Sequence, residues 1–218
     1  MTARPALTPE LSRTRVMAVL RSADASGLPA TARPLAAGGV TGLEITPTTS
    51  GALDAVAEVR GELGPEVAVG ADTVVTGAQA RDALAAGAQF PVTPVDADVV
   101  RTVAETGVTC HSGAWTPTEA STAWRAGAAA VKLFPAATGG PAYLRQLPAP
   151  LPDLPIGVDI HQAREYTGAG AHAVGVGSPL LRGADRNPTS RHLDRLTERA
   201  CALLEAASPV GHTEEAAR

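Results

Sequence analysis

The sequence predicts a single (β/α)8 barrel (a TIM barrel), a closed ring of eight parallel strands with helices outside it. Eight short runs of β-branched or apolar residues recur at intervals of roughly 17–26 residues. Alanine-rich segments with helical spacing of apolar residues lie between these runs, and polar residues stand at the ends of most runs. The chain has 218 residues and is 44% hydrophobic, which suits one barrel domain.

The apolar runs give the expected strands. In chain order they are residues 16–21, 42–46, 67–72, 89–94, 108–113, 129–135, 155–159 and 173–178. Glycine-rich turns separate most of them, but no glycine-rich dinucleotide turn follows the first run. The rival topology, an open doubly wound sheet, is therefore disfavoured.

Helical segments fill the intervals between the strands. The clearest are residues 28–37, 51–61, 77–86, 96–105 and 116–125. Several end at a glycine that can adopt a left-handed cap. Thr116, Pro117 and Glu119 give one strong helix start, with a capping hydroxyl, a proline in the first turn and a glutamate at the third position. We expect one domain over residues 1–218, with short polar extensions at both ends.

Composition excludes several classes of protein. The net charge is −4 and the arginines are scattered, so neither a nucleic-acid stripe nor a polybasic membrane patch is expected. Cys110 and Cys201 lack metal-ligand spacing, and two thiols favour a reducing compartment. The N-terminus lacks an apolar signal core, and no run reaches the roughly 18 apolar residues of a membrane span. We expect a cytoplasmic protein whose partners are small molecules.

Lys132 is the most informative residue, because it is the only lysine among 18 basic residues. It lies in an apolar run, residues 128–134 (AAAVKLF), where a buried strand is expected. Unlike arginine, an amine can lose its proton, attack a carbonyl and form an imine. Neutrality near pH 7 requires its pKa to fall by about 3 units from ~10.4, at about 4 kcal/mol, and burial acts in that direction. The alternative is a structural lysine that pairs with a carboxylate or reaches solvent.

Polar residues at the carboxyl ends of the strands are candidates for the site, because barrel chemistry lies there. They are Arg21, Glu44, Thr46, Asp72, Thr73, Thr93, Pro94, His111, Ser112, Lys132, Asp159, Gly177 and Ser178. Glu44 should point inward, where it either shuttles protons for Lys132 or holds it charged in a salt bridge. Arg21 has the planar fork that suits a substrate carboxylate, or it pairs with Glu44 or Asp72. Backbone N–H groups near Gly157 and Gly177 are expected to form an anion site.

Eight blocks of sequence carry a family resemblance. They are AVLR (18–21), AGGVTGLEIT (37–46), VGADTV (69–74), AGAQFPVTP (86–94), TPTEA (116–120), AGAAAVKLFPA (126–136), GGPAYL (139–144) and AVGVGSPL (173–180). Over roughly residues 16–204 the chain resembles the class I 2-keto-3-deoxy-6-phosphogluconate and phosphogalactonate aldolases, which include the 2-keto-4-hydroxyglutarate aldolases. VKLFPA followed by GGP is the most specific block.

The resemblance implies a trimer of barrels without a metal or other cofactor, in which Lys132 forms the imine with pyruvate or another 2-keto acid. Glu44 takes the place of the family's general acid and base, which acts through a water. The residues that match those holding the pyruvyl unit are Arg21, Thr73, Pro94 and Phe134. The residues that match the phosphate grip are Gly157, Val158, Gly177 and Ser178.

Three departures from the family pattern point to altered specificity. The family usually has GAGTV where this chain has GADTV, so Asp72 adds a carboxylate beside the pyruvate position. His111 and Ser112 replace the usual Pro-Gly at strand five. In an ungapped alignment Ile156 and Asp159 replace smaller residues on strand seven, where we expect them to weaken a phosphate grip.

His111 and Asp72 leave three readings open. They add a second acid and base, contact an altered aldehyde, or form a buried hydrogen-bonded pair. A metal site is not expected, because three ligands with suitable geometry are not evident.

These observations lead to one functional expectation and two alternatives. The expected reaction is reversible cleavage of a 2-keto-4-hydroxy acid to pyruvate and an aldehyde, in carbohydrate metabolism. The first alternative is a lysine-imine aldolase that acts on an unphosphorylated substrate in a specialised pathway. The second is a non-catalytic barrel that binds an anion.

Overall fold

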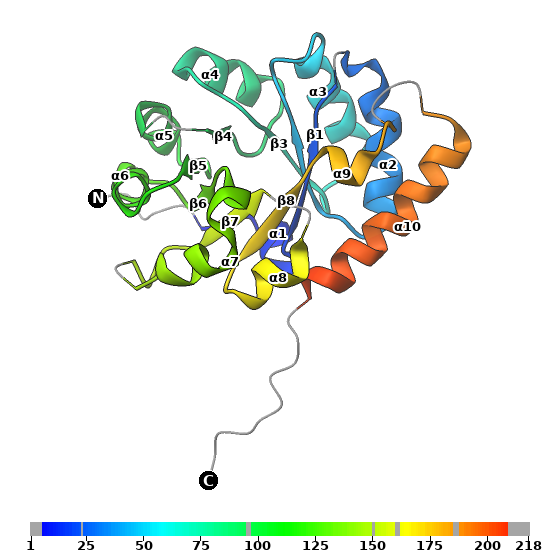
Figure 1. Cartoon of the computed structure of the whole chain (residues 1–218). Coiled ribbons are helices and arrows are strands. Elements are labelled where there is room, and N and C mark those ends of the chain that lie inside the picture. The colour runs from blue at the N-terminus through cyan, green and yellow to red at the C-terminus, as the bar shows by residue number, and fades with distance from the viewer. Residues whose placement is uncertain are drawn as a thin grey trace.

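The computed structural model describes residues 6–22, 24–94, 97–149, 151–159, 162–184 and 188–208, and within them the expected barrel is present (Figure 1). Its strands are β1 (Val16–Leu20), β2 (Gly42–Ile45), β3 (Ala68–Ala71), β4 (Val92–Thr93), β5 (His111–Ala114), β6 (Ala130–Leu133), β7 (Ile156–Asp159) and β8 (Ala173–Val176). Its helices are α1 (Pro9–Thr14), η1 (Ala25–Gly27), α2 (Leu28–Ala37), α3 (Ala52–Leu63), α4 (Gly77–Ala85), α5 (Ala97–Ala104), α6 (Pro117–Ala126), α7 (Ala136–Gln146), α8 (Ala163–Gly168), α9 (Ser178–Leu181) and α10 (Ser190–Ala207).

The barrel closes between its first and last strands. Neighbouring strands run in the order β3-β2-β1-β8-β7-β6-β5-β4 and are parallel. Met17 on β1 pairs with Gly175 on β8, and the two strands lie side by side in Figure 1. The remaining seam is bridged where Ala71 pairs with Pro91 and the Ala71 N–H donates to the Phe90 carbonyl at 3.0 Å. The carboxyl ends of all eight strands therefore face one mouth.

Strand residues alternate between two apolar compartments. Leu43, Ile45 and Val131 belong to the large core between strands and helices. A smaller cluster forms inside the barrel from Leu11, Met17, Ala68, Phe90, Val92 and Ala173. Glycine on several strands leaves room for these side chains; at Gly70 an added Cβ would collide with the ring of Phe90. A chain with 3% aromatic residues thus fills its barrel with one phenylalanine and smaller groups.

Helix α1 covers the amino end of the barrel. It contacts β2 and β8, and its Leu11 is 5% exposed and packs in the interior cluster. From the sequence we expected only a polar extension here. The buried Leu11 shows that this segment also supplies apolar surface to the barrel.

The boundaries of β4 and β5 differ most from expectation, while the other strands agree within two residues at each end. The ladder of β4 is confined to Val92 and Thr93; before it, Pro91 forms an isolated bridge with Ala71, and the Gln89 N–H donates to the Val69 carbonyl of β3 at 2.8 Å. Strand β5 begins at His111, which pairs with Val92, and not at residue 108. His111 is therefore the first residue of its strand and lies below the mouth.

Helix α6 begins as the sequence predicts. The Thr116 side chain accepts a hydrogen bond from the Glu119 N–H, and the Glu119 carboxylate accepts from the Thr116 N–H. Gly127 ends the helix with a φ of 109°, a left-handed conformation that suits glycine. A capping box of this kind satisfies N–H groups that the first helical turn leaves free.

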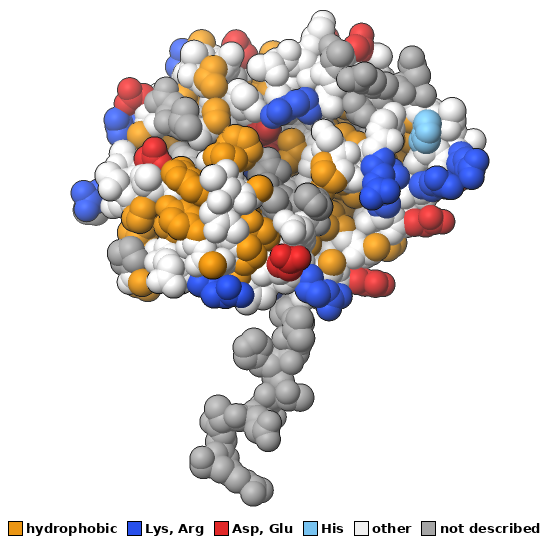
Figure 2. All heavy atoms as spheres, in the orientation of Figure 1, with side chains coloured by type: hydrophobic (Ala, Val, Ile, Leu, Met, Phe, Trp, Pro, Cys, Tyr) orange, Lys and Arg blue, Asp and Glu red, His pale blue; other side chains and the backbone are white. Residues whose placement is uncertain are grey.

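Hydrophobic side chains gather over α6 and α7 on the face seen in Figure 2, while arginines are scattered among other residues. Among the residues that the structure describes, the exposed large hydrophobic ones are Leu53, Val75 and Phe134. No helix among the described residues has the length and apolar character to cross a membrane.

Candidate active site

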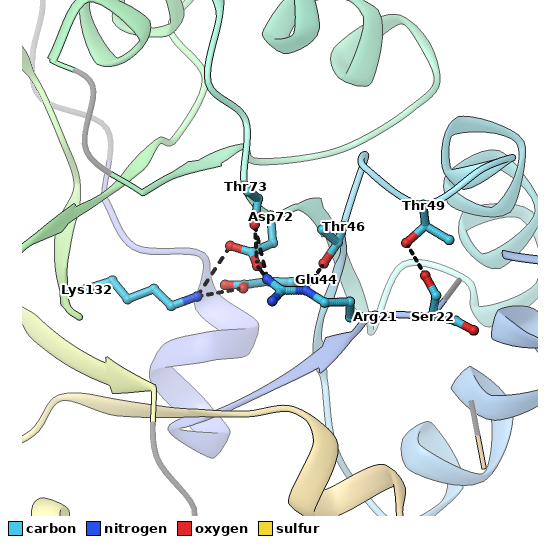
Figure 3. Close-up of polar contacts among 8 residues, drawn as sticks. All are labelled: Arg21, Ser22, Glu44, Thr46, Thr49, Asp72, Thr73 and Lys132. Atoms are coloured by element: carbon cyan, nitrogen blue, oxygen red, sulfur yellow. Dashed lines mark hydrogen bonds and ion pairs between the residues drawn. The ribbon is translucent and has the colours of Figure 1, made fainter. Parts of the chain in front are cut away.

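Lys132 extends from β6 into the barrel, as predicted. Its neighbours Val131 and Leu133 face the outer core, so alternation turns Lys132 inward. The side chain is 14% exposed, and its Nζ lies 3.3 Å from Glu44 Oε2 and 3.3 Å from Asp72 Oδ1 (Figure 3). One amine thus contacts two carboxylates.

Glu44 reaches Lys132 from β2, on the other side of the barrel. The residue is 3% exposed, and the inward direction predicted from its flanking residues is confirmed. In the ladder it lies opposite Val19 and Gly70. A buried carboxylate at this distance can exchange a proton with the amine.

Asp72 follows β3 directly and is 5% exposed. Its Oδ1 contacts Lys132, while its Oδ2 accepts hydrogen bonds from the Thr73 hydroxyl at 3.1 Å and from Arg21 at 3.4 Å. Thr73 has a φ of 60°, which is unusual for a β-branched residue and costs of order 1 kcal/mol. The backbone strain at Thr73 thus lies at the mouth of the barrel, beside the carboxylate.

Arg21 follows β1 and bridges several of these groups at the solvent edge. Its side chain is 61% exposed; its Nε donates to Thr46 Oγ1 at 3.4 Å, and its Nη2 donates to Thr73 Oγ1 at 3.3 Å. The pairing with Asp72 that the sequence left open is present. Because the guanidinium is exposed, it remains accessible to a substrate carboxylate.

Four of these residues, Arg21, Asp72, Thr73 and Lys132, line one pocket at the mouth, which we call the mouth pocket. It has a volume of about 220 Å³ and is lined by Arg21, Asp72, Thr73, Val92, Pro94, Gly113, Lys132 and Phe134. The four residues predicted to hold a pyruvyl unit are all in this set. The aromatic ring of Phe134 is partly exposed there, at 48%.

The two carboxylates alter the electrostatic expectation for Lys132. Burial alone disfavours the charged amine, but two carboxylates at 3.3 Å favour it. Without substrate, Lys132 is therefore in the salt bridge that the sequence left open as an alternative. Imine formation can still follow when one of the carboxylates accepts a proton from the amine before the amine attacks a ketone.

His111 lies deeper than predicted, beneath the mouth. It is 5% exposed, its ring lies 5.1 Å from that of Phe90, and its Nε2 has no hydrogen-bond partner. Burial and the nearby Lys132 lower the pKa of His111 from 6.5 to about 4, so the ring is neutral near pH 7. Asp72 bonds instead to Lys132, Thr73 and Arg21, so of the three readings left open, the one in which His111 and Asp72 form a hydrogen-bonded pair is wrong.

An inner cavity of about 40 Å³ lies beneath the mouth pocket. Its lining includes Glu44, His111 and Lys132 together with apolar residues of α1 and β8. His111 thus shares a space with the two catalytic candidates, although it does not reach the mouth pocket. No group of three or more His, Cys, Asp or Glu residues in the described ranges is arranged to hold a metal.

Two residues of the altered pattern face away from the site. Ser112 lines a space between β5 and α6 together with Thr118 and Thr122. Ile156 is 3% exposed and packs in the outer core, so the expectation that it crowds a phosphate cradle is wrong. The physical reason is strand alternation, which turns Gly157 and not Ile156 toward the interior.

The candidate anion residues are divided between two places. Gly157 pairs with Lys132 across the ladder, and both Gly157 and Val158 line the inner cavity. Gly177 and Ser178 follow β8 at the mouth end, where α9 is a single turn of four residues. Asp159 ends β7, and its side chain lies outside the described part of the structure.

Sequence reasoning missed two residues of the mouth pocket. Val92 and Gly113 line it, and an added Cβ at Gly113 would collide with the carbonyl of Pro94. Side chains two residues apart on a strand share a side, so Val92 lies on the same side as Phe90, and Gly113 on the same side as His111. Both positions could be inferred once the starts of β4 and β5 are known.

Comparison with known proteins identifies similar sequences. The family described as KDPG and KHG aldolase matches residues 7–194. A 2-dehydro-3-deoxy-6-phosphogalactonate aldolase of Escherichia coli (strain K12) is 36% identical over 150 residues, which cover 66% of this chain and 70% of that protein. A 2-dehydro-3-deoxy-phosphogluconate aldolase of Pseudomonas aeruginosa is 37% identical over 138 residues, which cover 61% of this chain and 62% of that protein.

Solved structures extend the similarity over most of the chain. A structure described as native KDPGal has a TM-score of 0.79 and 27% identity, covering 94% of this chain and 97% of that one. A KDPG aldolase from Legionella pneumophila, with pyruvate captured as a covalent carbinolamine intermediate, has a TM-score of 0.76 and 25% identity. That match covers 90% of this chain and 98% of the Legionella chain.

Proposed function

Because the chain belongs to the KDPG and KHG aldolase family, we propose that it is a class I aldolase that cleaves or forms a 2-keto-4-hydroxy acid through an imine on Lys132. The observation that carries the proposal is the contact of the Lys132 amine with Glu44 at 3.3 Å inside the barrel mouth. No metal or organic cofactor is needed, since the protonated imine is itself the electron sink.

The first steps use Glu44 as the proton acceptor. Glu44 takes a proton from the Lys132 ammonium, and the neutral amine attacks the C2 ketone. Glu44 then returns protons to the oxygen, which leaves as water and gives the iminium. We assign to the same carboxylate the acceptance of the C4 hydroxyl proton as the C3–C4 bond breaks. The enamine that remains takes a proton at C3, and hydrolysis releases pyruvate.

The mouth pocket supports binding of a pyruvyl unit. Arg21 offers an exposed guanidinium for the carboxylate, and Thr73 offers a hydroxyl beside it. Pro94 and Phe134 line the same pocket and supply apolar contact. Its volume of about 220 Å³ is below the roughly 300–1,000 Å³ of pockets for drug-sized ligands, which suits a ligand as small as a 2-keto acid.

The aldehyde portion of the substrate is the less constrained part of the proposal. We propose that Gly177 and Ser178, at the mouth end of β8, contact its distal end, together with Gly157 and Val158 as the family pattern implies. The alternative of an unphosphorylated substrate is no longer supported by Ile156, because that side chain packs in the outer core and does not crowd a phosphate site. We assign the protein to carbohydrate metabolism in the cytoplasm and expect a trimer, with small molecules as its partners.

A cleavage assay tests this function. Candidate substrates are 2-keto-3-deoxy-6-phosphogluconate, its galactonate epimer and 2-keto-4-hydroxyglutarate, with released pyruvate measured by a coupled lactate dehydrogenase reaction. We expect turnover of at least one substrate and complete loss in Lys132→Arg, since a guanidinium cannot form the imine. Arg60→Lys, a change on an outer helix, is the matched control. Turnover that survives in Lys132→Arg would refute the role of the amine.

A further inference from the structure

The polar groups around the mouth pocket balance to zero charge before any substrate binds. The two cations that line the pocket in the described part of the chain are Arg21 and Lys132. Two buried carboxylates, Glu44 and Asp72, contact Lys132 at 3.3 Å each. Asp72 uses its second oxygen to bind Arg21, the group that the proposed function assigns to the substrate carboxylate.

A 2-keto acid brings a third carboxylate into this pocket. Formation of the iminium does not compensate for this added negative charge, because the positive charge on the Lys132 nitrogen is retained. The ammonium loses two protons, which leave with the ketone oxygen as water. The nitrogen of the C=N bond keeps one proton and the positive charge. The complex would therefore carry one uncompensated negative charge close to Glu44 and Asp72, whose side chains are 4% and 7% exposed. Carboxylates that share one site disfavour each other's ionisation, so one of them tends to take up a proton.

Resting on the proposed function, we propose that Asp72 takes up one proton from solvent when a 2-keto acid binds and so makes the affinity for charged substrates depend on pH. The neutral Asp72 then donates a hydrogen bond to the substrate carboxylate and releases Arg21 to pair with it. Each 2-keto acid bound consumes one solvent proton, and that proton is released again with the product. Asp72 thus determines how strongly the site distinguishes carbonyl substrates that carry a carboxylate from those that do not.

The neighbours of Asp72 single it out as the proton acceptor. Arg21 approaches it from β1, Glu44 from β2 and Lys132 from β6, while Thr73 is next in the chain. His111 on β5 lies below, in the inner cavity, and is neutral near pH 7. Val92 and Pro94 on the β4 side of the pocket are apolar. Glu44 must remain ionised to accept the Lys132 proton, whereas Asp72 contacts the cation that the substrate carboxylate would claim.

Calorimetric titration measures the proposed proton uptake directly. Pyruvate is titrated into the full chain at several pH values between 5 and 8, in buffers with different ionisation enthalpies. The slope of the binding heat against that enthalpy counts the protons taken up. Pyruvamide, which has no carboxylate, is the matched ligand. The variants are Asp72→Asn, which keeps the shape, and Asp54→Asn, an exposed aspartate on α3, as control.

For pyruvate we expect up to one proton taken up by the wild type and by Asp54→Asn, and none by Asp72→Asn. In the wild type the affinity for pyruvate should fall as pH rises, by as much as tenfold per pH unit, because binding consumes a proton. Pyruvamide should show neither effect. Equal uptake in the wild type and Asp72→Asn, or no uptake in the wild type, would overturn the proposal. If Asp72→Asn does not fold, the pyruvate and pyruvamide results on the wild type decide.

A different result marks failure of the proposed function itself. If neither ligand leaves a reduced adduct on Lys132 at any pH in the presence of cyanoborohydride, there is no imine chemistry to modulate. An adduct that forms without proton uptake refutes only the role of Asp72.

Discussion

Replacement of His111 by phenylalanine should remove much of the acid sensitivity of this fold. Burial and the Lys132 charge lower the pKa of His111 from 6.5 to about 4. Above pH 6.5 the ring is neutral in both the folded and the unfolded chain, so it makes no contribution. Between pH 6.5 and 4 the unfolded chain binds a proton that the folded chain does not, so stability falls as pH falls.

The magnitude follows from these two values. The full difference corresponds to about 3 kcal/mol, and the part lost between pH 7 and pH 5 is about 2 kcal/mol. His111→Phe retains an aromatic ring for the contact with Phe90 and has no titrating group. Its free energy of unfolding should therefore fall by about 2 kcal/mol less than that of the wild type over the same pH interval.

Urea unfolding at pH 7 and pH 5, for both proteins, gives the required difference. His172→Phe, at an exposed histidine, is the matched control and should behave as the wild type does. Equal losses in the wild type and His111→Phe would refute the assignment of a neutral, buried His111.

Three further predictions concern single residues. Glu44→Gln should lower turnover by about 100-fold to 10,000-fold, since it removes the proton acceptor of Lys132; activity within tenfold of the wild type would contradict that role. In the native protein Cys201 should react with a thiol reagent at pH 8 and Cys110 should not, because burial raises the pKa of Cys110 to about 12; labelling of both without denaturant would contradict this. Thr116→Ala should cost about 1 kcal/mol and lower Tm by about 2–4 °C, since it removes the capping box of α6, whereas Thr118→Ala should have a smaller effect.

The order of elements could be predicted from the sequence because each is encoded locally. Apolar runs mark the strands, and a capping box begins α6 as its residues indicate. Alternation around Glu44 and Lys132 also gave the central pair, since their neighbours are large apolar residues that must face the helices. These signals need no knowledge of the partner strand.

What could not be predicted depends on register between strands. Thr109 and Cys110 resemble strand residues, yet the ladder with β4 begins at His111, which places that histidine below the mouth. Ile156 was interpreted from its place in an alignment, while the side of the sheet it faces is set by the pairing of Gly157 with Lys132. The contact of Asp72 with Arg21 also joins two separate strands, and only the closed barrel shows that Asp72 binds Arg21 and the Lys132 amine at the same time.

The most direct test of the central claim is a peptide map of the protein after reduction with borohydride in the presence of pyruvate. We predict one reduced pyruvyl group, located on Lys132, in the wild type and none in Lys132→Arg. An unmodified wild-type protein, or an adduct found only at the N-terminal amine, would contradict the assignment of Lys132 as the imine-forming residue.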